Sequence, residues 1–214
     1  MNNNNDFNFE SSIVSVTVED PELIRKNHAK IIEAGTKLFT KKGYHNTTMR
    51  EIARESTIGL GSIYQYVKNK EEILFLILEY ILRQYEYRLS RSIKPEADIE
   101  NKLYKSIEAY YLIVNKEYKK VVLAYAETNS LSSFYRNYIK ELELKTNKIF
   151  EDILEEGVEK KIFKPIDVSL VSYNIIMFGH MWALKRWYFI KKMTIEDYIH
   201  KQIDFIRKMI IKDS

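Results

Sequence analysis

The stretch TTMREIARESTIGLGSIYQYVKNK, residues 47–70, contains two short amphipathic segments separated by a small turn. Thr48 and Glu51 have the spacing of a capping box, in which the threonine hydroxyl accepts a hydrogen bond from one free amide at a helix start and the glutamate accepts from another. A helix therefore begins at about Thr48. The four residues STIG, 56–59, interrupt the apolar period before it resumes. This pattern predicts a helix-turn-helix.

The second segment carries hydrogen-bonding side chains at its outward positions, namely Ser62, Tyr64, Gln65 and Tyr66. Such groups reach phosphates and base edges without bringing a negative charge near DNA. The alternative is a helical hairpin in the core of an unrelated protein, with ordinary polar residues on its surface.

Charge favours DNA binding over that alternative. Residues 25–70 contain ten Lys or Arg residues against three Glu, a net charge of +7, whereas the whole chain carries +4. The first 24 residues contribute −5, so residues 71–214 carry only +2. Positive potential is thus concentrated where the helix-turn-helix is predicted, as phosphate binding requires.

Residues 25–75 resemble the DNA-binding domain of the tetracycline-repressor (TetR) family of transcriptional regulators. The resemblance rests on several motifs in the same order and spacing: Ile31, Ala34, Leu38 and Phe39, then KGY at 42–44, TTMREIA at 47–53, GSIYQYV at 61–67 and KEEIL at 70–74. There are departures from the family pattern. Thr57 stands where glycine is usual in the turn, Leu60 where a lysine or arginine is common, and Gly59 where a serine or threonine cap is frequent.

The resemblance implies a role for each matching residue. Backbone phosphates would be held by Thr48, Ser62, Tyr64, Tyr66 and Lys70, and base edges would lie close to Arg50, Leu60, Gly61 and Gln65. Side-chain chemistry agrees, because arginine binds guanine through two hydrogen bonds and glutamine pairs with adenine. For the two tyrosines the alternative is core packing, and for Arg50 it is a solvated surface charge.

Composition bounds the remaining possibilities. The 214 residues are enough for one small and one larger helical domain, and the absence of cysteine excludes disulfides and thiolate metal sites. No apolar run is long enough to span a bilayer, and the start MNNNND does not resemble a signal peptide. We therefore expect a cytoplasmic protein with a flexible arm at 1–24, a DNA-binding domain at 25–70 and an effector-binding and dimerisation domain at 71–214.

The chain is predicted to be all-α, with an N-terminal three-helix DNA-binding domain and a C-terminal helical bundle, about nine helices in all. Outside the motif, helices are expected at about 25–42, 70–92, 99–115, 117–129, 132–157, 168–191 and 195–211. Gly43 ends the first, and Asn69, Asp98, Asp167 and Thr194 have the positions of N-caps.

The last two predicted helices suggest a homodimer. The segment 168–191 is apolar on more than one face, so we expect it to be buried on two sides, one of them by a partner subunit. The family implies that these two helices form a four-helix interface with their symmetry mates. An intramolecular core is the alternative. The predicted interface residues are Val171, Ile175, Phe178, Tyr198, Gln202, Phe205 and Met209.

Aromatic residues are abundant in the C-terminal half, which suggests a mostly apolar effector pocket with a few hydrogen-bonding groups. The predicted pocket residues are Tyr104, Tyr111, Tyr125, Phe134, Tyr138, His180 and Trp182, with core packing as the alternative for each. An elongated apolar or aromatic effector is favoured, an acyl-coenzyme A being one candidate.

No catalytic residues, cofactor or metal site are predicted, since the chain contains no Gly-rich phosphate loop and no nucleophile motif, and its one Asp-x-x-His pair at 197–200 has no second copy. The sequence thus indicates a homodimeric regulator that binds a palindromic operator in double-stranded DNA and is released by a small molecule. Two other classes stay open: an architectural DNA-binding or protein-interaction module without an effector, and an all-helical enzyme.

Overall fold

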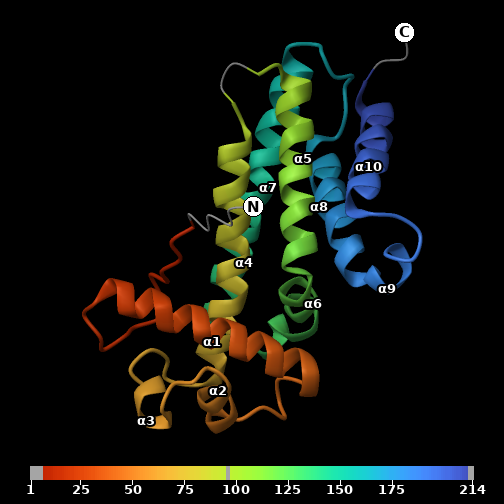
Figure 1. The fold of residues 1–214 in the computed structure, drawn as a ribbon. Coiled ribbons are helices and arrows are strands. Elements are labelled where there is room, and N and C mark those ends of the chain that lie inside the picture. Colours follow the sequence, from red (N-terminus) through yellow and green to blue (C-terminus); the bar gives the residue numbers. More distant parts are fainter. Residues whose placement is uncertain (1–6, 95–96, 212–214) are drawn as a thin grey trace. The chain divides into compact units, whose positions relative to one another are not determined.

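The computed structural model describes residues 7–94 and 97–211, and within these ranges the chain is all-helical. The α-helices are α1 Pro21–Lys42, α2 Met49–Glu55, α3 Leu60–Ile63, α4 Lys70–Ser92, α5 Ile99–Lys116, α6 Tyr118–Glu127, α7 Ser133–Glu159, α8 Val168–Leu184, α9 Arg186–Phe189 and α10 Ile195–Ile210 (Figure 1). A short 3-10 helix, Thr128–Ser130, follows α6. The all-α class is confirmed. The helix predicted at 168–191 is two helices, because α8 ends at Leu184 and a separate turn, α9, follows.

Four of the predicted helix starts are confirmed by hydrogen bonds, whereas the first helix begins at Pro21 and not at about residue 25. Thr48 and Glu51 form a complete capping box at α2, and Thr194 forms another with Asp197 at α10. The carboxylates of Asp98 and Asp167 accept from backbone amides at the starts of α5 and α8. At the end of α1, Gly43 has a φ of +87°, a conformation that only glycine adopts without strain.

Contacts divide the chain into two compact units. Unit 1 comprises Met1–Arg83 and Val122–Lys140, and unit 2 comprises Gln84–Val121 and Glu141–Ser214. Helices α4, α6 and α7 therefore contribute residues to both units. The domain boundary expected between residues 70 and 71 coincides with the start of α4, whereas the contacts place the division inside that helix.

In unit 1, α2 contacts both α1 and α3, and the apolar side chains of these helices form one core. Ile31, Ile52 and Ile63 are completely buried there. Helix α1 begins at Pro21 with Asp20 as its N-cap, so the boundary expected after residue 24 falls inside this helix. Residues 1–6 of the expected arm lie outside the described residues.

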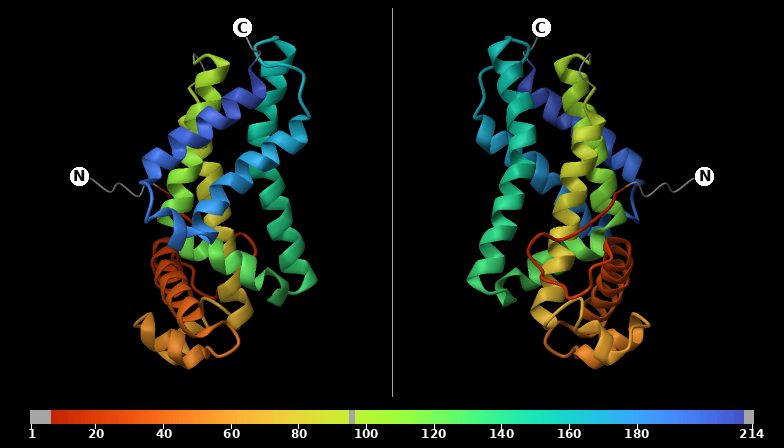
Figure 2. Two further views of the ribbon diagram at one scale, coloured as in Figure 1. Left: turned by 90° about the vertical axis from the view of Figure 1, so that its right-hand side faces the viewer. Right: turned by 90° about the vertical axis from the view of Figure 1, so that its left-hand side faces the viewer.

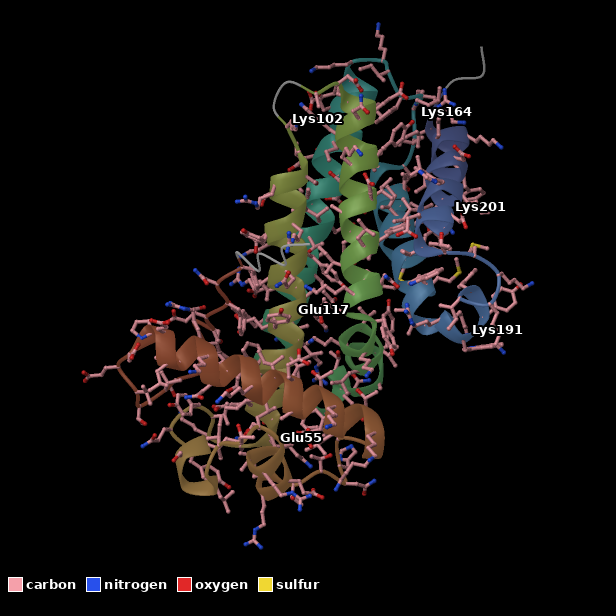
Figure 3. All side chains as sticks on the ribbon, in the orientation of Figure 1. Glu55, Lys102, Glu117, Lys164, Lys191 and Lys201 are labelled. Atoms are coloured by element: carbon pink, nitrogen blue, oxygen red, sulfur yellow. The ribbon has the colours of Figure 1, made fainter. Side chains whose placement is uncertain are left out.

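In unit 2, α5 packs against both α8 and α10 (Figures 1 and 2). Gly179 allows the close approach of α8, because a Cβ atom at this position would lie 2.8 Å from the ring of Tyr111. Glu117, labelled in Figure 3, follows the last turn of α5 and forms a buried ion pair with Lys120. Burial of apolar side chains where α5 meets α8 and α10 is the main stabilising contribution in unit 2.

Candidate nucleic-acid interface

The helix-turn-helix is built from α2, a four-residue connection and α3. Ile52 and Ala53 bury the inner face of α2, and Ile63 and Val67 bury the next segment. Helix α3 contains only four residues, and Tyr64 to Tyr66 continue as a turn. The second helix is therefore shorter than the apolar period suggests, and a helix of this length is held by packing rather than by its own hydrogen bonds.

The connection between α2 and α3 has a strained backbone at Thr57, the position at which the sequence indicates strain. Thr57 has a φ of +59°, in the left-handed region, where a β-branched residue crowds its own backbone. This is the position at which glycine is usual in the resembling family. The amide of Ile58 donates to the carbonyl of Ala53, so the turn is still closed by a backbone hydrogen bond.

Most of the predicted DNA-contacting residues lie on the surface of unit 1. Exposed residues are Thr48, Arg50, Leu60, Gly61, Ser62, Tyr64 and Gln65. The side chain of Tyr64 is 48 % exposed, and a Cβ atom at Gly61 would meet nothing within 4 Å. This surface is therefore accessible to a double helix, and it holds both a guanidinium and an amide able to read base edges.

Tyr66 is an exception. It is only 4 % exposed, its ring packs 6.3 Å from the imidazole of His28, and its carbonyl lies 3.1 Å from Nε2 of that histidine. Burial lowers the pKa of His28, so the imidazole is neutral at pH 7. Because the chain leaves helical geometry after Ile63, the outward face of α3 does not continue to Tyr66. Tyr66 thus has the core position that was the alternative to a phosphate contact.

Lys70 is the second exception. Its ammonium group donates to three backbone carbonyls, those of Tyr44 at 2.8 Å, Thr47 at 3.0 Å and His45 at 3.1 Å. The same group lies 4.5 Å from the centre of the Tyr44 ring. An ammonium has three protons, and all three are used here. Lys70 thus holds the connection between α1 and α2, where the sequence suggested a phosphate contact.

Positive charge around this surface is partly neutralised. Lys37 and Lys42 form ion pairs with Glu55 and Glu51. In contrast, the exposed residues Lys41, Arg50, Arg54 and Lys68 form no ion pair among the described residues. These four side chains are the ones best placed to release counterions from a phosphate backbone.

The residues predicted for the effector pocket are not brought together within either unit. Tyr125, Phe134 and Tyr138 belong to unit 1, and Phe134 is 63 % exposed. The other four, Tyr104, Tyr111, His180 and Trp182, belong to unit 2. Their sequence positions fall on different helices, and spacing within a helix carries no information on which helices meet.

Three of the four residues in unit 2 have polar groups already engaged in structural hydrogen bonds. The hydroxyl of Tyr111 donates to the carbonyl of Ile175 at 2.8 Å, and the indole of Trp182 donates to the side chain of Asn115 at 2.9 Å. The hydroxyl of Tyr104 donates to Glu100 within α5. These contacts indicate packing roles.

His180 has a more unusual environment. Its Nε2 lies 2.8 Å from the hydroxyl of Tyr110, and its ring packs near the rings of Tyr110 and Tyr85. Burial lowers the pKa of His180 to about 4, so the ring is neutral at pH 7. Neutral imidazole and phenol groups surrounded by aromatic rings form a polar site inside unit 2. Tyr110 has a position that the sequence also suggested for the pocket, whereas Tyr85 was not among the predicted pocket residues.

Three of the residues predicted for the dimer interface pack inside unit 2. Val171, Ile175 and Tyr198 are buried, and the hydroxyl of Tyr198 donates to the carbonyl of Phe178. Phe205, in contrast, is 51 % exposed and stacks edge to face on Phe178 at 5.6 Å.

The apolar residues exposed on α8 are Leu170, Tyr173 and Met177, which were not among the predicted interface residues. Their offsets of three and four residues are a helical stripe that was visible in the sequence. When a helix is apolar on several faces, its sequence alone does not indicate which face would bind a partner subunit.

Two protein-family models match the chain. The model of bacterial regulatory proteins of the tetR family matches residues 31–77, and the model of the tetracyclin repressor-like C-terminal domain matches residues 96–210. A relative, the HTH-type transcriptional regulator HbdR of Aromatoleum sp. (strain CIB), is 36 % identical over 196 residues, covering 92 % of this chain and 85 % of the relative.

Solved structures share the fold. A bacterial regulatory protein in the tetR family from Rhodococcus RHA1 superposes with a TM-score of 0.80 at 24 % identity, covering 88 % of this chain and 99 % of that one. AibR in complex with isovaleryl coenzyme A and operator DNA gives a TM-score of 0.72 at 20 % identity, covering 84 % and 97 %. Separately, none of the described helices has the length and apolar character needed to cross a membrane.

Proposed function

Because the chain belongs to the tetR family of bacterial regulatory proteins, which are transcriptional regulators and not enzymes, we propose that the exposed surface of α2 and α3 reads a palindromic operator in double-stranded DNA. The observation that carries this proposal is the exposure of Arg50 and Gln65 on the surface of a segment with a net charge of +7. Base-reading side chains and electrostatic attraction to phosphate are then combined on one short motif.

Individual roles follow from exposure. Arg50 and Gln65 contact base edges, Leu60 offers an apolar contact to a thymine methyl group, and Gly61 permits close approach of the backbone. Phosphates are contacted by the hydroxyls of Ser62 and Tyr64, whereas the Thr48 hydroxyl donates its one proton to Glu51 and stays within the capping box. Tyr66 and Lys70 support the motif from within unit 1 and do not contact DNA.

We further propose that the chain acts as a cytoplasmic homodimeric repressor. The exposed stripe Leu170, Tyr173 and Met177 on α8 and the exposed Phe205 on α10 form the apolar surface for a second copy. Phe178, Gln202 and Met209 lie partly exposed on the same two helices and contribute at its edge. Two-fold symmetry then presents two reading surfaces to the two halves of a palindrome.

The effector is proposed to be an apolar small molecule, with an acyl-coenzyme A as the leading candidate. Supporting this choice, unit 2 contains neutral polar groups at His180 and Tyr110 among aromatic rings, which suits a mostly apolar ligand fixed by a few hydrogen bonds. AibR, which shares the fold, was solved with isovaleryl coenzyme A and operator DNA. Release requires that the ligand bind the DNA-free state more tightly than the operator-bound state.

Selection of operator sequences from a random duplex library, followed by fluorescence anisotropy, tests the DNA proposal. One palindrome is expected to be enriched, and Gln65→Ala is expected to lose about 1–3 kcal/mol on the preferred base pair only. Binding that spreads equally over all duplexes would support an architectural role instead.

A panel of acyl-coenzyme A esters, read by thermal shift and by release from the selected operator, tests the effector. A true effector weakens operator binding by the same factor by which the operator weakens effector binding. An ester that stabilises the protein but leaves operator affinity unchanged would exclude that compound as the signal.

A further inference from the structure

Residues 7–20, which precede α1, are packed against unit 1 although they form no helix. Phe9 is 8 % exposed and Val14 is 5 % exposed. The rings of Phe7 and Phe9 lie edge to face on Tyr80 of α4, with centroid distances of 5.8 and 5.4 Å. In Figure 2 the red N-terminal segment runs across the yellow helix α4. Aromatic burial of this kind anchors the segment.

Polar contacts continue along the same segment. The hydroxyl oxygen of Ser11 accepts from the amides of Ile13 and Val14 and so forms a tight turn. On α4, burial raises the pKa of the Glu79 carboxylate, and Ser11 and the Arg83 guanidinium oppose that rise. The segment therefore passes close to a carboxyl group that is buried in unit 1.

A second contact joins the segment to α7. The hydroxyl of Ser12 lies 3.4 Å from that of Tyr138, which in turn accepts a hydrogen bond from Arg83 at 2.9 Å. Closer to the start of the segment, Glu10 forms an ion pair with Arg25 of α1 at 3.6 Å. Both ion-pair side chains are well exposed, so this pair contributes little.

The far end of the segment reaches the DNA-reading motif. The amide of Thr17 donates to the carbonyl of Gln65 at 3.0 Å. Gln65 stands just beyond the end of α3, where the amides of Gln65, Tyr66 and Val67 donate to the carbonyls of Ser62 and Ile63. Outside the motif, His28 Nε2 lies 3.1 Å from the carbonyl of Tyr66, whereas the carbonyl of Gln65 meets the Thr17 amide. A four-residue helix has little stability of its own. A bond from outside the motif therefore has a large influence on its geometry.

We propose that residues 7–18 are a strap that positions the DNA-reading backbone at Gln65, with Phe9 as its anchor on α4 and the Thr17 amide as its tie. The strap does not contact DNA. Its one charged residue is Glu10, and its role is to lower the conformational freedom that the reading segment loses on binding DNA. This inference rests on the proposed role of Gln65.

Two matched pairs of variants test the strap. Phe9→Ala removes the anchor without changing charge, and Asn8→Ala, at an exposed neighbour, is its control. Thr17→Pro removes the amide donor, whereas Thr17→Ala keeps it. The readouts are hydrogen exchange of the amides at 65–67 in the DNA-free protein and operator affinity by anisotropy.

We expect Phe9→Ala and Thr17→Pro to speed exchange at 65–67 and to raise the operator Kd about fivefold, the loss equivalent to one backbone hydrogen bond. Both controls should behave as the wild type. If Phe9→Ala fails to fold, the Thr17 pair still decides the question, because Thr17 lies near the surface.

Unchanged exchange in both test variants would overturn the proposal, as would equal effects of Thr17→Ala and Thr17→Pro. A variant that binds the operator more tightly would also overturn it, since the segment with its Glu10 carboxylate would then be repelling DNA. The exchange measurement needs no DNA. Faster exchange combined with unchanged operator affinity would therefore show that the Thr17 amide positions residues 65–67 but that Gln65 does not contribute to operator binding.

Discussion

Replacing Lys70 by methionine separates a structural role from a DNA-contacting one. The change keeps most of the apolar stem and removes the ammonium, which donates to the carbonyls of Tyr44, His45 and Thr47. Hydrogen bonds from a charged group are each worth about 1.5–3 kcal/mol when water cannot replace them. Since the carbonyl of His45 is in an exposed contact and Lys70 itself is partly exposed, water compensates for much of the loss.

We therefore expect Lys70→Met to lower the free energy of unfolding by about 2–3 kcal/mol, which corresponds to a melting temperature lower by roughly 5–10 °C in a chain of this size. Urea unfolding followed by circular dichroism measures the first quantity and differential scanning calorimetry the second. Lys68→Met is the matched control, because Lys68 is exposed and its side chain makes no hydrogen bond among the described contacts.

The salt dependence of operator binding completes the test. A lysine that contacts phosphate contributes about 1 to the slope of log Kd against log salt concentration, and its removal lowers the slope by that amount. We expect Lys68→Met to lower the slope and Lys70→Met to leave it unchanged. Wild-type stability in Lys70→Met together with a lower slope would refute the structural role and restore the phosphate contact.

Three further predictions concern stability, each measured by urea unfolding. Thr57→Gly should raise the free energy of unfolding by about 1 kcal/mol, because glycine adopts the φ of +59° without strain; a loss of stability would contradict this. Gly157→Ala should cost about 2–3 kcal/mol, since its Cβ would lie 2.1 Å from the ring of Phe163. Because burial lowers the pKa of His180 to about 4, the unfolded state binds a proton below pH 6.5 that the folded state excludes, and stability is lost as pH falls from 6.5 toward 4. The His180 contribution between pH 7 and pH 5 is about 2 kcal/mol and should be absent in His180→Gln; an identical pH slope in both proteins would contradict the assignment.

Local chemistry made four helix starts and the helix-turn-helix motif predictable. The caps Thr48, Asp98, Asp167 and Thr194 were all identified from the sequence, because a capping hydrogen bond joins residues two or three positions apart. The turn strain at Thr57 was also visible, since it depends on one residue type at one position. The expected DNA-contacting residues were identified from the order and spacing of the motif, and seven of the nine are exposed.

What the sequence could not determine depends on contacts between distant segments. Lys70 reaches the carbonyls of residues 44, 45 and 47, and Thr17 reaches Gln65, pairings that no periodicity encodes. The faces of α8 illustrate the same limit: apolar residues lie all round it, and only packing against α5 buries Ile175 and leaves Met177 exposed. A helical period specifies which residues share a face, whereas the tertiary structure alone decides what that face meets.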